Sequence, residues 1–568
     1  MSMRYEEGKL RVQRELCPPS LDERIAVDHP ARVVDAFVDG LRMDELGFGK
    51  SEPAWTGRPG YDPRDLLKLY LYGYINRVRS SRRLQRECER NIEVMWLINS
   101  LVPDFRTISD FRKDNRLAIK DTFKAFITIL REARLLGGKL TVDGTKVRAN
   151  NSIKRSFTPE LTAKKLHYIE EQIQKLEAYL DDMDSYDERE ETLHLDIPRE
   201  KMPDKLKELR ERASKYRGFQ SRFRAGEKQI LETDPECRTL HSKDGLHPAY
   251  NIQTVTETAN HFITNFETVT ANNDQGLLSG MGEVVKKELK RDIVHLIADK
   301  GYESRHDIEK CLMNGIIPDV GLKYDKKERV FNPDYREADI PSAQKASSHP
   351  DDIRACLHAG VLPDCYEGTN IHVEVQGRGV LSCFIRHADG SVTCPMGRTL
   401  LKHQDKKYGT QYGSREACRT CPNRCTDAKG EKTVLIGYNS IVVPVLMYGH
   451  PEYPLQQLPK DYVISPNNHS LHRKGPAKET VKITIKRDKA RQQIRKETAE
   501  HPFGTIKWHD GMQSFLCRGK EKVTAETALA YTGYNIRRAI NLTTPDKGAI
   551  PGILMLLQHR LRAKMAIS

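Results

Sequence analysis

A nearly continuous apolar run at residues 292–298 places the strongest constraint on how this chain folds. The run reads Asp-Ile-Val-His-Leu-Ile-Ala and lacks the alternation of apolar and polar residues that a half-exposed strand shows. Such a run predicts a strand that is buried on both faces. It is followed at once by Asp299, so a carboxylate closes this central strand.

A second aspartate lies inside another short strand. Residues 139–147 are rich in β-branched side chains and carry Asp143 in their middle. Once a helical insertion is left out, the elements around these two strands follow the order strand, strand, strand, helix, strand, helix, strand. This order predicts a chain of the α+β class with a ribonuclease-H-like mixed β-sheet flanked by helices. The remaining expected core elements are strands at 249–256, 261–267 and 316–320, and helices at 275–289 and 304–314.

Helical patterns occupy both ends of the chain and one insertion. Leucines at three- and four-residue spacing follow Asp62 and Pro63, which predicts a helix capped by Asp62 with proline at its first position. A capping-box pattern at 107–110 predicts one long helix that reaches about Leu136. Asp274 is expected to cap the helix that follows it. Further predicted helices are a charged hairpin at 161–228, a segment from 488 that Pro502 should kink by removing a hydrogen bond near Thr498, and a last helix at 525–541.

Charge and composition narrow the class of protein. The chain has 93 Lys and Arg against 79 Asp and Glu, a formal net charge of +14. This surplus indicates a polyanionic partner, most often nucleic acid. No apolar stretch approaches the ~20 residues that span a bilayer, and the N-terminus lacks the apolar region of a secretion signal. We therefore expect an intracellular protein with no membrane partner, and the absence of Walker and Gly-x-Gly-x-x-Gly patterns predicts no nucleotide cofactor.

The two strand aspartates suit phosphodiester chemistry by two divalent ions. That chemistry needs carboxylates from separate elements, because the metals bridge attacking and leaving oxygens about 4 Å apart. In a sheet of the predicted order, Asp143 and Asp299 lie side by side. Mg²⁺ prefers hard oxygen ligands and keeps several waters, so three carboxylates suffice. For either aspartate taken alone, a turn or a helix cap is the alternative.

Four blocks of this sequence resemble those of bacterial insertion-sequence DDE transposases. Three of them resemble the family's catalytic signatures, and the first resembles the helical domain that these proteins carry before the catalytic core. All four occur in the family's order and together span nearly the whole chain. The blocks are Trp55 to Tyr74, Thr141 to Thr145, Ala298 to Tyr302 and Glu500 to Lys507.

This resemblance implies a fold, an activity and a set of partners. Asp143, Asp299 and Glu500 would bind two Mg²⁺ or Mn²⁺ ions on a ribonuclease-H-like fold. The protein would cut double-stranded DNA at the terminal inverted repeats of an insertion sequence and join the 3′-hydroxyl ends to target DNA by transesterification. Cutting both ends needs two active sites, so a homodimer on DNA is expected, in the bacterial cytoplasm and nucleoid-associated when bound. The alternatives are a ribonuclease-H-like nuclease without strand transfer and an inactive DNA-binding repressor.

The third catalytic block departs from the family's fuller pattern. Glu500 and Lys507 have the family's seven-residue spacing, and Glu497 is a rival carboxylate near the same helical face. Related transposases have a tyrosine seven positions and an arginine four positions before the glutamate, where this chain has Gln493 and Lys496. A lysine can neutralise a phosphate as a point charge but lacks the arginine fork. Lys496 and Lys507 are predicted phosphate contacts, with ordinary solvated charge as the alternative.

Five arginines near residue 85 follow three- and four-residue spacing. This spacing predicts a positive stripe along one face of a helix. Such a stripe suits the DNA backbone, where phosphate contacts position a protein without specifying sequence and weaken steeply with salt. The alternative is a solvated face that pairs with Glu87 and Glu89. The arginines are Arg79, Arg82, Arg83, Arg86 and Arg90.

Four cysteines before the third acidic block form a candidate structural zinc site. Their spacing is C-x23-C-x2-C-x3-C, and four thiolates can hold Zn²⁺ tetrahedrally. The first stands apart from the others, so His403 or Cys383 could take its place as a ligand, and free buried cysteines are the alternative. Similar cysteine-bearing inserts precede the catalytic glutamate in one subgroup of the transposases named above. The four are Cys394, Cys418, Cys421 and Cys425.

These patterns divide the chain of 568 residues into segments, and its length fits three or four domains of about 100–200 residues. The predicted segments are an all-α N-terminal DNA-binding domain (1–137), the first strand of the catalytic core (138–157), a helical-hairpin insertion (158–235), the continued core (236–322), a cysteine-containing insertion (323–480) and a last core segment with the third acidic residue and C-terminal helices (481–568).

Overall fold

The computed structural model divides the chain into two compact units. The first comprises residues 1–291, 296–302 and 490–568, and the second comprises residues 292–295 and 303–489. Within the part of the chain that the structure describes, no helix combines the length and apolar character needed to cross a lipid bilayer. The described residues are 19–49, 60–185, 201–242, 245–322, 327–378, 385–386, 391–394, 398–407, 409–421, 430–437 and 478–542.

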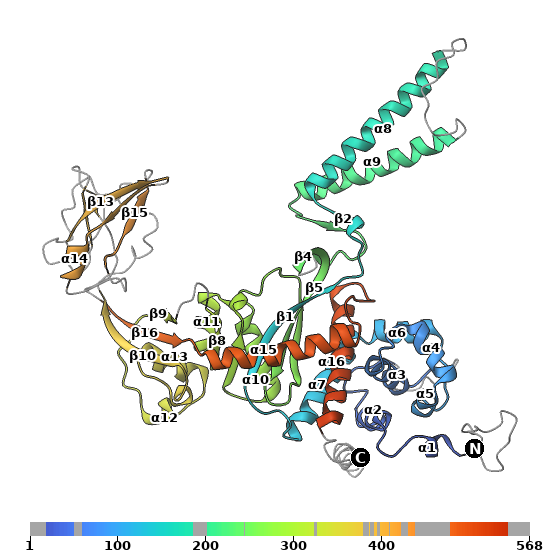
Figure 1. Cartoon of the computed structure of the whole chain (residues 1–568), viewed down its shortest axis with the longest axis horizontal. Coiled ribbons are helices and arrows are strands. Elements are labelled where there is room, and N and C mark those ends of the chain that lie inside the picture. The colour runs from blue at the N-terminus through green and yellow to red at the C-terminus, as the bar shows by residue number, and fades with distance from the viewer. Residues whose placement is uncertain are drawn as a thin grey trace, which may run out of the picture. The chain divides into compact units, whose positions relative to one another are not determined.

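A mixed β-sheet forms the core of the first unit (Figure 1). Its strands are β1 (Leu140–Arg148), β4 (Arg238–Ser242), β5 (Gly245–Glu257), β6 (Ile263–Val269) and β7 (Val294–Ala298). β5 pairs antiparallel with β1, β4 and β6, whereas β1 and β7 are parallel. Val142 lies opposite Ala298 in the parallel ladder. Asp143 and Asp299 therefore occupy the next positions on neighbouring strands, which is the side-by-side placement expected from the sequence.

Helices fill the N-terminal part of the first unit. The Asp62 side chain accepts the backbone N–H of Arg64 at 2.8 Å, and Pro63 takes the first helical position. The predicted cap is therefore confirmed. The helices are α1 (Leu21–Arg24), α2 (Pro30–Asp39), α3 (Pro63–Ile75), α4 (Ser81–Arg90), α5 (Ile92–Leu97), α6 (Phe105–Asp114) and α7 (Arg116–Glu132).

The single long helix predicted from residue 107 is wrong, because α6 and α7 are separate helices. α6 is capped by Asp104, which accepts the N–H of Arg106 at 2.8 Å. The break falls at Asn115, whose side-chain amide donates to the carbonyl of Phe111 at 2.9 Å. The same side chain accepts the N–H of Gly49 at 2.7 Å. A side-chain bond to the backbone here competes with helix continuation.

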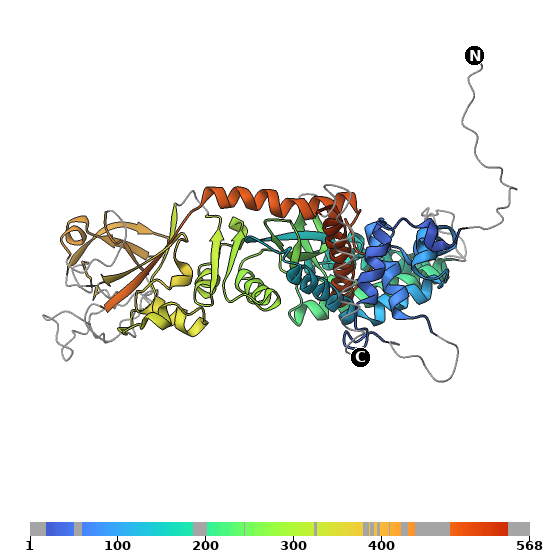
Figure 2. The same cartoon turned by 90° about the horizontal axis from the view of Figure 1, so that it is seen from below.

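The helix α16 (Lys520–Leu542) lies between the N-terminal helices and the sheet (Figures 1 and 2). It packs against α3, α7 and β6, and α10 (Leu278–Leu289) packs against α7 and β6. Asn535 satisfies both backbone groups of Ile263, with its Oδ1 accepting at 3.0 Å and its Nδ2 donating at 2.8 Å. The Tyr531 hydroxyl meets Thr254 Oγ1 at 2.8 Å. Buried polar contacts thus fix α16 to the sheet in addition to apolar packing.

The predicted helical hairpin is confirmed as α8 (Pro159–Ser185) and α9 (Met202–Arg224). Arg217 pairs with Glu170 at 2.8 Å, and Arg210 pairs with Glu177 at 2.6 Å. Earlier positions of α8 meet later positions of α9, so the two helices run antiparallel. The strands β2 (Ser156–Phe157) and β3 (Ile230–Leu231) pair at the base of the hairpin.

The second unit contains two antiparallel sheets. β16 (Lys478–Lys486) pairs with β9 (Glu328–Phe331) and β10 (Ile371–Arg378). The other sheet has the strand order β11-β12-β13-β14-β15, and its small core contains Val392, Leu400 and Tyr412. The remaining elements are β8 (Ile316–Val320), β11 (Ile385–Arg386), β12 (Val392–Thr393), β13 (Thr399–Lys406), β14 (Gly409–Gly413), β15 (Val434–Gly437), α11 (Arg305–Leu312), α12 (Ser342–Lys345), α13 (Pro350–His358) and α14 (Arg415–Arg419).

Candidate active site

Backbone N–H groups hold the carboxylates of Asp143 and Asp299 in place. Asp143 Oδ1 accepts the N–H of Gly144 at 2.8 Å, and Asp299 Oδ1 accepts the N–H of Gly301 at 2.6 Å. Burial raises the pKa of Asp143 to about 6, and the Arg495 guanidinium opposes this rise. The carboxylates of Asp299 and Asp274 raise the same pKa further. Negative charge is therefore concentrated where β1 and β7 lie together.

Asp274 belongs to this cluster and was not recognised from the sequence. Its predicted role as a helix cap is wrong, because α10 begins at Leu278 with Leu277 at the N-cap and has no side-chain cap hydrogen bond. Its Oδ1 instead accepts hydrogen bonds from Asn251 Nδ2 at 2.9 Å and from Gln253 Nε2 at 2.6 Å. The hydroxyl of the buried Tyr302 donates to Gln253 Oε1 and so orients the amide that holds Asp274. The Asn-Asn-Asp sequence resembles an ordinary cap, and only the strand pairing shows where its carboxylate lies.

Two glycines leave room for the carboxylates. A Cβ at Gly144 would lie 2.5 Å from Gln253 Nε2 and 2.8 Å from Asp274 Oδ1. A Cβ at Gly301 would lie 2.7 Å from Asp299 Oδ1 and 3.6 Å from Asp274 Oδ2. Each glycine therefore permits a close approach that any larger residue would prevent.

An arginine that the sequence analysis did not single out contacts the cluster directly. Arg495 lies on α15 (Lys489–Gly504), a helix that continues through Pro502. Its Nη1 lies 3.2 Å from Asp143 Oδ2, and the two side chains are only 13% and 22% exposed. Its Nε is buried without a hydrogen-bond partner. Arg495 thus forms a largely buried ion pair with the first aspartate.

The third predicted acidic residue stands apart in this structure. Glu500 is exposed on α15, and so is Glu497, which accepts a hydrogen bond from Gln493 at 3.0 Å. His501, the residue after Glu500, stacks on His261 with ring centres 5.2 Å apart. Among the described residues, no three His, Cys, Asp or Glu side chains are gathered closely enough to hold a metal ion. The carboxylates of Asp143, Asp299 and Glu500 are therefore not assembled into a coordination shell here.

The two predicted phosphate-binding lysines differ in their surroundings. Lys496 is exposed on α15. Lys507 lies on η7 (Thr505–His509), a π-helical turn, and its Nζ donates to the carbonyl of Lys146 at 2.7 Å. Lys146 is on β1, three residues after Asp143. Lys507 is thus tied to β1, the strand that carries Asp143, and is not an isolated solvated charge.

The prediction that five arginines form one stripe on a helix is wrong for Arg79, which precedes α4. Arg79 donates to the carbonyls of Gly511 at 2.8 Å and Ser514 at 3.1 Å. It also pairs at 3.5 Å with Glu526, whose side chain is completely buried. Glu526 in turn accepts the backbone N–H of Cys517 at 2.9 Å. Arg79 therefore joins the N-terminal helices to the C-terminal segment.

The other four arginines lie on α4 and are exposed. Arg90 donates from its Nε to Glu87 at 3.1 Å, and the Arg82 guanidinium lies 4.9 Å from the ring centre of Phe105. Arg83 and Arg86 are exposed on the same helix. The stripe is therefore shorter than predicted, and one of its members already pairs with a glutamate.

Three of the four predicted zinc ligands lie among the described residues. Cys394 Sγ accepts the N–H of Arg398 at 3.3 Å, and Cys418 Sγ accepts the N–H of Lys432 at 3.4 Å. Cys421 follows α14. Cys425 and the alternative ligand Cys383 lie outside the described residues. The other alternative, His403, lies 3.3 Å from Glu431.

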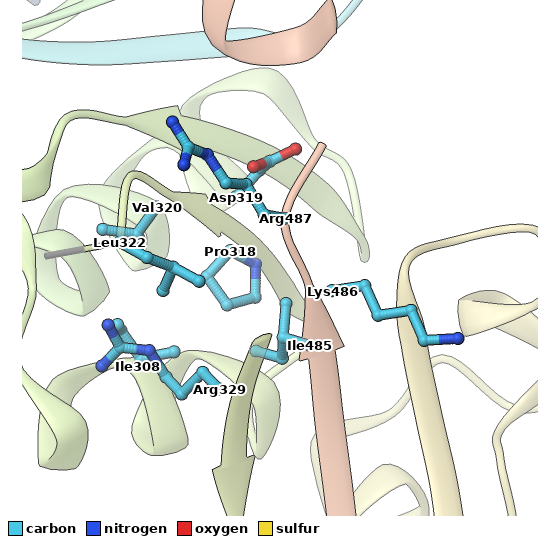
Figure 3. Close-up of a pocket in the computed structure, with 9 residues that line it drawn as sticks. All are labelled: Ile308, Pro318, Asp319, Val320, Leu322, Arg329, Ile485, Lys486 and Arg487. Carbon is cyan, nitrogen blue, oxygen red and sulfur yellow. The ribbon is translucent and has the colours of Figure 1, made fainter. Parts of the chain in front are cut away.

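A separate pocket lies in the second unit, where α11, β8, β9 and the end of β16 meet (Figure 3). It contains none of the residues predicted to be catalytic. Its walls combine apolar side chains with one carboxylate and three basic groups. The lining residues are Ile308, Pro318, Asp319, Val320, Leu322, Arg329, Ile485, Lys486 and Arg487.

The close approach at Gly144 can be tested by adding one methyl group. Gly144→Ala is expected to lower the free energy of unfolding by about 1–3 kcal/mol, because the new Cβ would displace Asp274 and its partners. Gly280→Ala is the control, since a Cβ at this exposed helical position meets nothing within 4 Å. That variant should gain roughly 0.5–1 kcal/mol. Urea unfolding followed by fluorescence compares the two, and equal effects would contradict the packing described here.

Comparison with known proteins identifies two family domains in this chain. Residues 19–114 match the family described as Transposase domain (DUF772), and residues 459–540 match the family described as Transposase DDE domain. No curated protein matches the chain. A solved structure described as a piggyBac transposase synaptic complex with hairpin DNA aligns with 94% of this chain and 81% of that chain at 9% identity. Its TM-score of 0.27 is too low to establish a common fold.

The two family matches include the first and the last of the four sequence blocks. One match covers α1 to α6, and the other covers α15 and most of α16 together with Glu500. The chain therefore carries two transposase domains, the second of the DDE type, which indicates a protein of DNA transposition.

Proposed function

We propose that this transposase cuts DNA at the ends of its element and joins the 3′-hydroxyl ends to target DNA at a site built on Asp143 and Asp299. The observation that carries the proposal is the parallel register of β1 and β7, which places these two aspartates side by side. Three successive antiparallel strands, β1, β5 and β6, followed by β7 parallel to β1, support a ribonuclease-H-like core. Phosphodiester chemistry requires such neighbouring carboxylates.

The residues at this site fit divalent cations that prefer oxygen. Asp143 and Asp299 lie on adjacent, parallel-paired segments, and the glycines beside them keep the space around their carboxylates open. Burial, and after it the negative charges of Asp299 and Asp274, raise the pKa of Asp143, so a cation there would stabilise its ionised form. Mg²⁺ or Mn²⁺, when bound as a pair, would activate the attacking oxygen and stabilise the leaving oxygen.

Glu500 is the proposed third ligand, on the strength of the family's third block. Arg495 on the same helix reaches Asp143, which supports a location of α15 beside the two aspartates. Glu500 lies about 7.5 Å further along the helix axis. Bringing its carboxylate to the aspartates requires a movement of the helix or of its side chains, which we assign to binding of metal and DNA.

The remaining residues position the DNA. Lys496 and Lys507 are proposed to contact phosphates near the reacting bond, and the N-terminal domain with its exposed arginines is proposed to hold the terminal inverted repeats. Target DNA would enter the same site after cleavage. Because the two ends of the element must be cut together, a homodimer on DNA is proposed.

Replacement of single carboxylates tests this chemistry. Asp299→Asn and Glu500→Gln should abolish both cleavage and joining of labelled element-end DNA with plasmid target in Mg²⁺, because each removes one metal ligand. Glu497→Gln is the matched control and should retain both products. Denaturing gels resolve them. Cleavage that survives in Asp299→Asn would contradict the site, nicks without joined product would favour a nuclease, and binding without cleavage in the wild type would favour a repressor.

The arginines on α4 give a second prediction. A double Arg83→Ala, Arg86→Ala variant should weaken DNA binding and reduce the slope of log affinity against log salt by about 1 for each lost phosphate contact. Its unfolding temperature should not change, because both side chains are exposed. Arg79→Ala should lower that temperature, because it leaves the buried carboxylate of Glu526 without its cationic partner. Equal salt slopes in the double variant and the wild type would contradict the proposed contact.

A structural zinc ion is proposed for Cys394, Cys418, Cys421 and Cys425. Backbone N–H groups donate to the sulfur atoms of Cys394 and Cys418, an arrangement that stabilises thiolates. Elemental analysis of the protein purified under reducing conditions should find about one zinc per chain. Cys421→Ser should lose it, and a wild-type protein without zinc would refute the site.

A further inference from the structure

The buried ion pair between Arg495 and Asp143 bears on how a metal ion reaches the proposed site. This inference rests on the proposed function, because it concerns loading of the same carboxylates. The Arg495 Nη1 lies 3.2 Å from Asp143 Oδ2, and Asp143 Oδ1 is already bonded to the N–H of Gly144. A cation that takes Asp143 as a ligand must therefore share these oxygen atoms with the backbone N–H of Gly144 or with the guanidinium.

Because the guanidinium and the metal ion are both positively charged, the metal ion is expected to displace the guanidinium from Asp143. The carboxylates of Asp143, Asp274 and Asp299 lie close enough to act on one another, and Arg495 is the cation that opposes them at Asp143. A divalent ion brings twice the charge of a guanidinium to the same oxygen atoms. Because like charges repel strongly where water is excluded, the ion and Arg495 cannot both stay at Asp143 without a large cost.

The ion pair with Asp143 also does not satisfy all the hydrogen-bond donors of Arg495. Its Nε is buried and has no hydrogen-bond partner. A buried N–H group without a partner costs about 1–3 kcal/mol. The arginine therefore has more to gain from a second anionic partner than its contact with Asp143 provides, and a DNA phosphate offers several acceptor oxygens in the geometry that a guanidinium prefers.

We propose that Arg495 is a built-in competitor for the first divalent metal ion, and that DNA tightens metal binding by drawing the Arg495 side chain away from Asp143. Without DNA, the guanidinium occupies Asp143 and keeps metal affinity low. When DNA is bound, a phosphate takes the guanidinium and Asp143 becomes available. The two ligands are then coupled, so each strengthens the binding of the other by the same factor.

Manganese titrations of the full-length protein test the first half of this proposal. Isothermal titration with Mn²⁺ in the absence of DNA should show that Arg495→Gln binds the ion about tenfold more tightly than the wild type, because a cation near the carboxylates is lost. Arg495→Lys keeps the charge and should stay close to the wild type. Lys489→Gln removes the same charge from an exposed position on the same helix and should leave the affinity for Mn²⁺ unchanged.

The second half is tested by repeating the titrations with a bound duplex that carries the element end. DNA should tighten Mn²⁺ binding to the wild type by about tenfold, and this gain should disappear in Arg495→Gln. Equal or weaker Mn²⁺ binding by a folded Arg495→Gln protein, or an undiminished effect of DNA, would overturn the proposal. If Arg495→Gln does not fold, an Arg495→Lys protein that binds Mn²⁺ tenfold more tightly or more weakly than the wild type overturns it.

The same experiment separates this inference from the proposed function. If Asp143→Asn binds Mn²⁺ as the wild type does, the metal site itself is wrong and the inference falls with it. If Asp143→Asn loses Mn²⁺ binding but Arg495→Gln does not gain it, the site stands and only the competition is refuted.

Discussion

The parallel pairing of β1 with β7 is the constraint on which the site depends. Val142 opposite Ala298 fixes Asp143 beside Asp299, and a shift of the register by one residue would turn one of these side chains to the other face of the sheet. α16 supports the sheet from one side through Asn535, which bonds both backbone groups of Ile263 on β6. The geometry of the two carboxylates is thus a property of the whole first unit.

Bringing carboxylates together creates repulsion that the protein must offset. Backbone N–H groups of Gly144 and Gly301 bond to Asp143 and Asp299, and Arg495 pairs with Asp143. These contacts stabilise the cluster without a metal ion, yet they leave Arg495 Nε without a partner. The arrangement is therefore suited to exchange one cation for another, which is what a site that loads metal only with its substrate requires.

Local sequence patterns predicted most helices and strands and the positions of the two aspartates. They could not predict contacts between segments that are distant in the sequence. The Asp62 cap and the helical hairpin depend on neighbouring residues and were predicted correctly. Asn115 breaks the expected long helix through a bond to Gly49, 66 residues away. Asp274, Arg79 and Arg495 find their partners across the fold, so their spacing in the sequence carried no sign of these roles. For Arg495, its position one residue before Lys496, where related transposases have an arginine, was the only available hint.

Iron-directed cleavage of the protein chain tests the central claim most directly. Fe²⁺ replaces Mg²⁺ at oxygen-rich sites, and with ascorbate and peroxide it generates hydroxyl radicals that cut the backbone next to the bound ion. In the complex with element-end DNA, we predict cuts beside both Asp143 and Asp299, suppressed by excess Mg²⁺ and absent in Asp299→Asn. Cuts confined to other parts of the chain, or none that Mg²⁺ suppresses, would contradict a metal centre at the paired strands.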